Sequence, residues 1–239
     1  MLLSRSFRTL TLVLPPCAIS LLCRCTHLPW RVSSSWVLGR QRSYWRYLRR
    51  RVLGPPTPPY TRVTQTGDPV LRCTASCVPS ARISHPETQA VVERMVRVLH
   101  AGCCVGISAP QLGVPLRILA LAFSEEMCKA VPPVVRKARE MSPFPLQVFI
   151  NPEMRIVDSR IFHFPEGCSS VQGFSAVVPR HYGVEISGLN PKGEQITWQA
   201  NGWAARIIQH EMDHLEGILY IDKMDPRTFV NVSWMEIND

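Results

Sequence analysis

Acidic residues are absent from the first part of this chain, and this limits where a folded domain can lie. Residues 1–67 contain eleven arginines but no lysine, aspartate or glutamate. The 239 residues include 27 lysines and arginines and 18 acidic residues, so residues 68–239 carry the other 16 basic residues and a net charge of −2. We therefore expect the globular fold in this nearly neutral part, which lacks the positive charge of a nucleic-acid-binding surface.

The composition of the first segment is typical of a mitochondrial transit peptide, which is rich in arginine and poor in acidic residues. A secretory signal or a membrane anchor is the alternative. The apolar stretch of residues 10–23 is interrupted by Pro15 and Pro16 and is shorter than the roughly 20 residues that cross a bilayer. We predict a mitochondrial transit peptide with a proline-rich connector over residues 1–63, one domain in the mitochondrial matrix over residues 64–239, and no membrane partner.

Hydrophobic periodicity predicts two long helices, over residues 86–99 and 202–215, with Gly217 as the stop signal of the second. Residues 123–145 are expected to form a surface excursion that contains a helix over 134–141. Short β-forming runs predict strands at residues 116–121, 148–151, 155–157, 184–189, 195–198 and 218–221. Because strands and helices do not alternate as βαβ units, we expect an α+β fold with antiparallel strands.

The second predicted helix contains the sequence His210-Glu211-Met212-Asp213-His214. Residues four apart lie on one face of a helix, so both imidazoles can reach one metal ion while Glu211 reaches the water beside it. Glu211 would then act as general base in a hydrolysis. The alternative is two histidines that share an amphipathic helix by chance. Asp213 points to a different face, and we expect it to form an ion pair, with Arg180 as a candidate partner.

Two protein ligands hold a metal ion incompletely, so a third is needed. One class of zinc peptidase has its third ligand, a histidine, where this chain has Tyr220. Another class uses a glutamate further along the chain, and Glu236 is the only late glutamate here. Zinc peptidase is therefore the weaker hypothesis. Cys168, beside Gly167 at the end of an apolar strand, offers a thiolate instead. For Cys168 alone, the alternative is a buried free thiol.

Residues 104–111 read Cys-Val-Gly-Ile-Ser-Ala-Pro-Gln. Small residues allow another backbone to approach, and Gln111 after the rigid Ala-Pro step can donate an amide N–H to a developing oxyanion. Taken alone, this segment is better explained as a strand-to-loop joint.

Together and in this order, the three segments resemble the peptide deformylase family. The family motifs G-x-G-x-(A/S)-A-P-Q, E-G-C-x-S and H-E-x-D-H are similar to residues 104–111, 166–170 and 210–214. The resemblance extends from about Gly67 to about Lys223. It implies an α+β fold with antiparallel sheets around a central metal-binding helix. It also implies removal of the formyl group from N-formylmethionyl chains, with release of formate, which suits mitochondria because they start translation with formylmethionine.

The resemblance also assigns roles. It implies one divalent metal ion, natively Fe²⁺ with Co²⁺ or Zn²⁺ as substitutes, and three ligands, Cys168, His210 and His214. Glu211 would be the acid and base, and Gln111 and the backbone N–H of Ser169 would stabilise the oxyanion.

A peptide substrate should bind as an extended strand. The segments expected beside it contain Val105, Gly106, Pro165 and Gly167. Trp203 and Ile207 precede His210 on the same helical face and are candidates for the methionine pocket, with core packing as the alternative. Transient contact with the mitochondrial ribosome and a homodimer are further expectations, the second because exposed strand edges invite pairing.

Two residues depart from the family pattern: Cys104 replaces the first glycine, and Ser169 replaces the leucine usual in bacterial members. We therefore expect activity at a reduced rate. Two alternatives stay open: a zinc peptidase of the H-E-x-x-H type, and a catalytically weak deformylase-like binding protein. The intact Glu211 argues against the binding protein, because a purely structural metal site needs no base.

Overall fold

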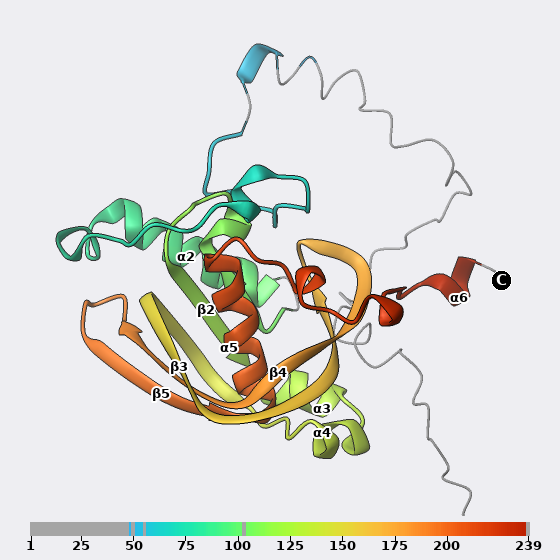
Figure 1. The fold of residues 1–239 in the computed structure, drawn as a ribbon. Helices are drawn as coiled ribbons and strands as arrows, with labels where there is room; N and C mark the ends of the chain where they lie inside the picture. The colour runs from blue at the N-terminus through green and yellow to red at the C-terminus, as the bar shows by residue number, and fades with distance from the viewer. Residues whose placement is uncertain (1–47, 49–50, 55, 102–103, 238–239) are drawn as a thin grey trace, which may run out of the picture.

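The structure is a computed structural model that describes residues 48, 51–54, 56–101 and 104–237. Most of the expected transit peptide and connector lies outside the described residues. Figure 1 shows the described chain as a curved sheet with helices against it.

The strands form one antiparallel sheet in the order β1-β2-β3-β4-β5, with β6 paired to β4. The strands are β1 Gly106–Ser108, β2 Ile118–Phe123, β3 Phe144–Cys168, β4 Val171–Leu189, β5 Gln195–Asn201 and β6 Val230–Asn231. The expected combination of antiparallel strands and helices is confirmed. The described strands belong to one continuous sheet rather than to several, because β3 and β4 are long and bend together.

Besides a helical stretch at residues 51–53, five α-helices accompany the sheet in the described residues. They are α2 Pro86–Ala101, α3 Glu125–Ala130, α4 Pro133–Ala138, α5 Gly202–Leu215 and α6 Trp234–Ile237. Short 3₁₀ turns are η3 Pro69–Arg72, η4 Ser80–Arg82, η5 Ala109–Leu112, η6 Tyr220–Asp222 and η7 Pro226–Thr228. The helix predicted over residues 202–215 has the same bounds in the structure, and the one predicted over 86–99 is two residues longer. Among the described residues, no helix combines the length and apolar character that crossing a membrane requires.

Three local predictions were wrong. Residues 155–157 are not a separate strand, because they belong to the 25-residue β3, whose pairing with β4 continues along the hairpin. Residues 218–221 do not form a strand, since Tyr220–Asp222 is a 3₁₀ turn in which the Asp222 N–H donates to the Leu219 carbonyl. The helix expected over residues 134–141 ends at Ala138, because Glu140 takes a left-handed conformation with φ of 51° that a helix cannot continue through.

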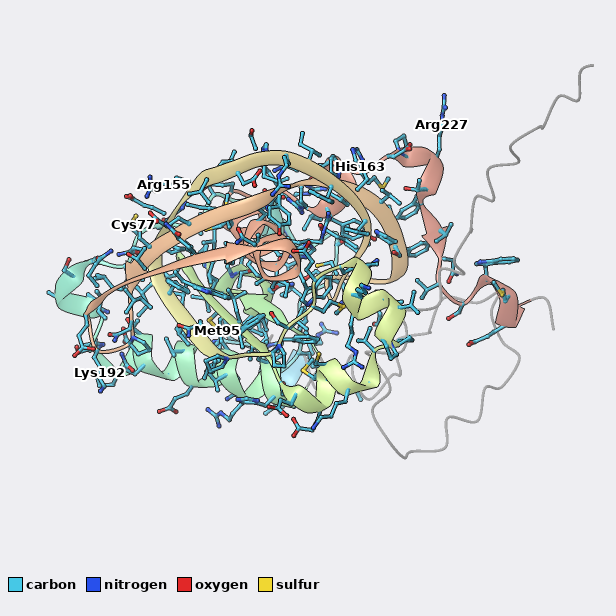
Figure 2. All side chains as sticks on the ribbon, turned by 90° about the horizontal axis from the view of Figure 1, so that it is seen from below. Cys77, Met95, Arg155, His163, Lys192 and Arg227 are labelled. Carbon is cyan, nitrogen blue, oxygen red and sulfur yellow. The ribbon has the colours of Figure 1, made fainter. Side chains whose placement is uncertain are left out.

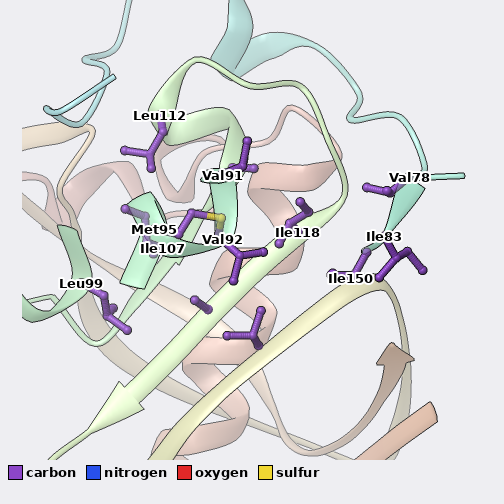
Figure 3. Close-up of a cluster of buried hydrophobic side chains, with 13 residues drawn as sticks. Val78, Ile83, Val91, Val92, Met95, Leu99, Ile107, Leu112, Ile118 and Ile150 are labelled. Atoms are coloured by element: carbon purple, nitrogen blue, oxygen red, sulfur yellow. The ribbon is translucent and has the colours of Figure 1, made fainter. Parts of the chain in front are cut away.

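Two hydrophobic clusters fix the helices. Helix α2 inserts Met95 and its neighbours against β1 and β2, where Ile107 and Ile118 are fully buried (Figure 3). Helix α5 packs against β1, β2, β4 and β5 through a second cluster that includes Ile208 and Leu215. Figure 1 shows α5 crossing the middle of the curved sheet. Charged side chains such as Arg155, Lys192 and Arg227 project from the periphery (Figure 2). This packing brings the end of α5 beside β1 and the turn that joins β3 to β4.

Candidate active site

Three candidate metal ligands meet at the junction of these elements. Cys168 is the last residue of β3, and His210 and His214 lie one turn apart on α5. The Cys168 Sγ lies 3.2 Å from His214 Nε2, and the donor atoms of all three residues lie within 4.8 Å of one another. A thiolate and two imidazoles in this arrangement fit one divalent ion and leave a position for a further ligand.

A buried carboxylate orients His210. Its Nδ1 lies 3.0 Å from Glu166 Oε2, so Nδ1 carries the proton and Nε2 is left for the metal side. Histidines that bind metals usually donate their second ring N–H to such a partner. The fit to a metal ion therefore extends beyond the three donor atoms.

Glu166 belongs to a network of buried charges. Its carboxylate accepts two hydrogen bonds from Arg180, both at 2.9 Å, and one from Arg206 at 2.6 Å. Arg180 also donates to Asp213 at 2.5 Å, and Asp213 accepts from Lys223 at 2.6 Å. The predicted ion pair between Asp213 and Arg180 is thus confirmed. The network connects α5 to β3 and β4 directly beneath the ligands.

Local electrostatics favour the ionised forms of the two acidic groups beside the histidines, Glu166 and Cys168. Burial raises the pKa of Glu166, but hydrogen bonds from His210 and Arg180 outweigh burial and hold this pKa well below its usual range. Burial also raises the pKa of the Cys168 thiol, and the charge of His214 with hydrogen bonds from both histidines reverses this and lowers the pKa far below its usual value. Cys168 is therefore poised as a thiolate, the form that binds metals.

Glu211 lies beside the ligands in a confined position. Its side chain is buried, and its Oε2 accepts no hydrogen bond from the residues that the structure describes. Burial raises the pKa of Glu211, partly offset by His214 and His210. A Cβ atom at Gly106 would lie 2.6 Å from Glu211 Oε1, so a side chain there would force the carboxylate to shift. A buried carboxylate with a raised pKa and a free oxygen can take up and return a proton.

The amide of Gln111 has a fixed orientation. Its Oε1 accepts the Ser108 backbone N–H at 2.9 Å, within the capping box of η5. The Nε2 group therefore faces the site, where it lies 3.6 Å from Cys168 Sγ and donates to the Ser169 and Ser170 hydroxyls at 3.2 Å each. The amide donor that the sequence predicted thus lies beside the cysteine.

One cavity of about 250 Å³ joins these groups. All the residues predicted to touch substrate line it, namely Val105, Gly106, Pro165, Gly167, Trp203 and Ile207. The predicted catalytic residues Gln111, Ser169 and Glu211 line the same cavity. Residues that are separated by up to about a hundred positions in the sequence are therefore brought together.

Trp203 and Ile207 pack with the α5 core cluster and also line the cavity. Ile207 is 4% exposed and belongs to the α5 core cluster, yet it lines the cavity. The Trp203 ring lies edge-on to Phe123, with centroids 6.3 Å apart, and the Arg139 guanidinium lies 5.6 Å from its centroid. Burial lowers the pKa of Arg139 to about 10. The surface excursion that carries Arg139 thus supports one wall of the cavity.

Comparison with known proteins identifies the family. A family model described as polypeptide deformylase matches residues 60–229. The chain belongs to the peptide deformylase family. Peptide deformylases are metal-dependent hydrolases, and the three donors on β3 and α5 provide the candidate metal site.

Several deformylases are similar to this chain. The mitochondrial peptide deformylase of Homo sapiens is 60% identical over 83% of this chain and 82% of its own length. Peptide deformylase 1 of Streptomyces coelicolor is 36% identical over 75% of this chain and 78% of its own. The class I type b peptide deformylase of Acinetobacter baumannii, solved with Met-Ala-Ser bound, is 27% identical, with a TM-score of 0.60 over 69% of this chain and 99% of that chain.

Sequence reasoning missed several residues of this deformylase site. Glu166 belongs to the motif over residues 166–170, but its hydrogen bonds with His210 and Arg206 were not predicted, since these partners lie far away in the sequence. It also missed a further part of the cavity wall. The residues concerned are Val171, Gln172, Gly173, Phe174 and Val232. Its position could have identified Glu166, because it is an acidic residue two positions before the candidate ligand Cys168.

Proposed function

We propose that this deformylase removes the formyl group from the N-terminal formylmethionine of newly made mitochondrial proteins and releases formate. The observation that carries the proposal is the convergence of Cys168, His210 and His214 beside the buried Glu211, with Cys168, His210 and Glu211 lining one cavity. The similarity to the human mitochondrial enzyme and the acid-free first segment support the mitochondrial matrix as the compartment. They also support a transit peptide and connector over residues 1–63 and a catalytic domain over residues 64–239.

In this proposal, three side chains hold one divalent ion. They are Cys168 at the end of β3, and His210 and His214 on the central helix α5. When bound, the ion supplies Lewis-acid activation of water and of the formyl carbonyl. A set of one thiolate and two imidazoles accepts several first-row metals, and the order of affinities does not select one of them. We propose Fe²⁺ as the native ion, with Co²⁺ or Zn²⁺ as substitutes.

Glu211 moves the proton. Its carboxylate takes a proton from the water that attacks the formyl carbon and returns it to the amine that leaves. The raised pKa of Glu211 suits both steps, because a carboxylate with a pKa nearer neutrality is a stronger base in the first step and its protonated form can still donate to the amine in the second. Gly106 keeps this carboxylate in reach by leaving space at its side.

Gln111 and Ser169 stabilise the negative charge that develops on the formyl oxygen. The Gln111 Nε2 group is held on the cavity side by Ser108, and the backbone N–H of Ser169 follows directly after Cys168. Donors fixed in advance lower the barrier because they need no reorganisation when the charge appears.

The substrate binds as an added strand. In the sheet order β1 is terminal, so among the described strands its outer edge has no partner. A peptide along Val105 and Gly106, facing Pro165 and Gly167, makes main-chain hydrogen bonds that tolerate many sequences. Trp203 and Ile207 receive the methionine side chain. The Met-Ala-Ser peptide bound to the Acinetobacter baumannii enzyme supports this class of ligand.

The test is formate release from formyl-Met-Ala-Ser by the full chain loaded with Co²⁺. We expect release by the wild type and by the control Cys73→Ala, whose exposed thiol lies outside the cavity, and none by Glu211→Ala or Cys168→Ala. A folded, metal-loaded protein without release would favour the deformylase-like binding protein. Cleavage of an internal peptide bond would favour the zinc peptidase.

Two partner proposals accompany this function. Formylated chains emerge from the mitochondrial ribosome, so we propose transient contact there. We also propose a homodimer through the edge of β5, the other terminal strand in the sheet order. Sedimentation of the full chain alone and with ribosomes tests both.

A further inference from the structure

Residues that follow the family match contribute to the cavity. The match ends at residue 229, and β6 begins at Val230. In β6, Val230 pairs with Ser175 and Asn231 with Phe174 of β4. The next backbone N–H, that of Val232, donates to the Gly173 carbonyl at 3.0 Å. This short strand therefore fixes Val232 against the start of β4.

Val232 reaches the same cavity as the catalytic groups. It lines the cavity together with Gly173 and Phe174, at a part of the wall that the metal ligands do not occupy. The segment is fastened a second time, because the Phe174 and Phe229 rings stack with centroids 4.9 Å apart and planes 4° from parallel. An ordered position for Val232 follows from backbone pairing and from ring stacking together.

This part of the wall has a distinct chemistry. Its lining residues lie on β4 and directly after β6, and none of them carries a charge. Apart from the Gln172 amide, their side chains are apolar or absent: Val171, Gln172, Gly173, Phe174 and Val232. The charged lining residues, by contrast, come from the end of β3 and from α5 and include Glu166 and Glu211. An apolar occupant fits this part of the wall, since a charged group there would lose water without gaining a partner.

The occupant follows from continuity with the reaction site. A formylmethionine whose formyl group lies between Gln111 and Glu211, and whose side chain lies at Trp203, sends the rest of the peptide along the remaining cavity wall. We propose that Val232 and Phe174 contact the side chains of the residues after the formylmethionine and make the enzyme favour apolar residues there. This proposal rests on the proposed function.

The test compares formyl-Met-Leu-Leu with formyl-Met-Lys-Lys, using the Co²⁺-loaded full chain and its Val232→Asp variant. For the wild type we expect the higher kcat/KM with the leucine peptide. In Val232→Asp we expect the leucine peptide to lose about tenfold in kcat/KM, since apolar contacts discriminate at least to this degree. The lysine peptide should gain about two- to fivefold from a partly exposed ion pair. Val232→Ala should lower the preference without favouring lysine.

The matched control is Met235→Asp, which places the same charge in the same segment at an exposed residue that does not line the cavity. Its ratio of the two kcat/KM values should equal that of the wild type. Binding of the product peptides Met-Leu-Leu and Met-Lys-Lys, measured by tryptophan fluorescence, should change in the same direction as kcat/KM and does not depend on turnover.

The test distinguishes a failure of the proposed function from a failure of the proposal for Val232. If the wild type releases no formate from either peptide or from N-formylmethionine amide, the proposed function fails. If the wild type releases formate and the ratio of the two peptides is the same in Val232→Asp, the proposal for Val232 is overturned. A change of the ratio in Met235→Asp as large as in Val232→Asp would also overturn it, because charge in the segment would then act without contact.

Discussion

Replacing Glu166 with glutamine tests the energetics beneath the site. The side chains of Glu166, Arg180 and Arg206 are 5%, 3% and 5% exposed, so their charges are withdrawn from water. Four donor groups, from the two arginines and His210, share the two carboxylate oxygens. Glutamine offers one oxygen to these donors and turns an NH₂ group toward the rest. The substitution therefore removes the acid that pairs with Arg206 and one of the two acids that pair with Arg180, and it leaves net positive charge buried.

We expect Glu166→Gln to lower the free energy of unfolding by about 3–5 kcal/mol, the usual cost of breaking a buried ion pair on one side. For a domain of this size, this corresponds to a decrease in Tm of roughly 6–20 °C. The assay is urea unfolding of the metal-free full chain, followed by far-UV circular dichroism. Because His210 loses its orienting partner, Co²⁺ affinity should also fall by about 10–100-fold.

Two controls make this result specific. Glu87→Gln removes the same charge from an exposed pair with Arg82 and should change stability little. The double variant Glu166→Gln with Arg206→Met removes one acid and one base, so its cost should fall short of the sum of the single costs by more than about 1 kcal/mol. A loss below about 1 kcal/mol in Glu166→Gln itself would refute the view that Glu166 neutralises the buried arginines.

Three further substitutions test the site. Ser169→Leu removes the hydroxyl that accepts a hydrogen bond from the Gln111 amide at 3.2 Å. Steady-state kinetics should therefore show kcat/KM rising about two- to tenfold, and an unchanged or lower value would count against a hydroxyl that competes with the substrate. Gly106→Ala places a Cβ 2.6 Å from Glu211 Oε1, and kcat should fall at least about tenfold with Co²⁺ affinity retained; full activity would contradict the close fit. Arg139→Met removes the guanidinium over the cavity tryptophan, and KM for formylmethionyl peptides should rise about two- to fivefold at unchanged kcat; a fall in kcat alone would contradict a role in the pocket.

Local sequence patterns predicted the two long helices, α2 and α5, but not the long hairpin. Helix α5 follows from apolar spacing and a stop at Gly217, which has φ of 71°. Strand β3 has many exposed positions and no apolar run to mark its middle, so its length depends on pairing with β4 across the turn after Cys168. The segment 218–221 contains β-forming residues, but Tyr220 instead packs with Leu219 and Val178 into a small core. Tertiary packing overrides propensity there.

The candidate site was predicted to the extent that its chemistry is local. The two histidines and Glu211 share one helix, and Gln111 and Cys168 each lie in a short motif. The ion network around Glu166 joins β3, β4 and α5, and no spacing rule relates residues that distant. Val232 was beyond prediction for a similar reason, since only the pairing of β6 with β4 brings it to the cavity.

The account depends most on whether Cys168, His210 and His214 hold one metal ion together. Titration of the metal-free full chain with Co²⁺ measures this directly, because a thiolate ligand produces a charge-transfer absorption that imidazole and carboxylate ligands do not. We predict that the absorption saturates at one ion per chain, disappears in Cys168→Ala, and persists in Cys128→Ala, which removes a buried thiol elsewhere. An absorption that persists in Cys168→Ala, or that never forms in the wild type, would contradict the proposed metal site.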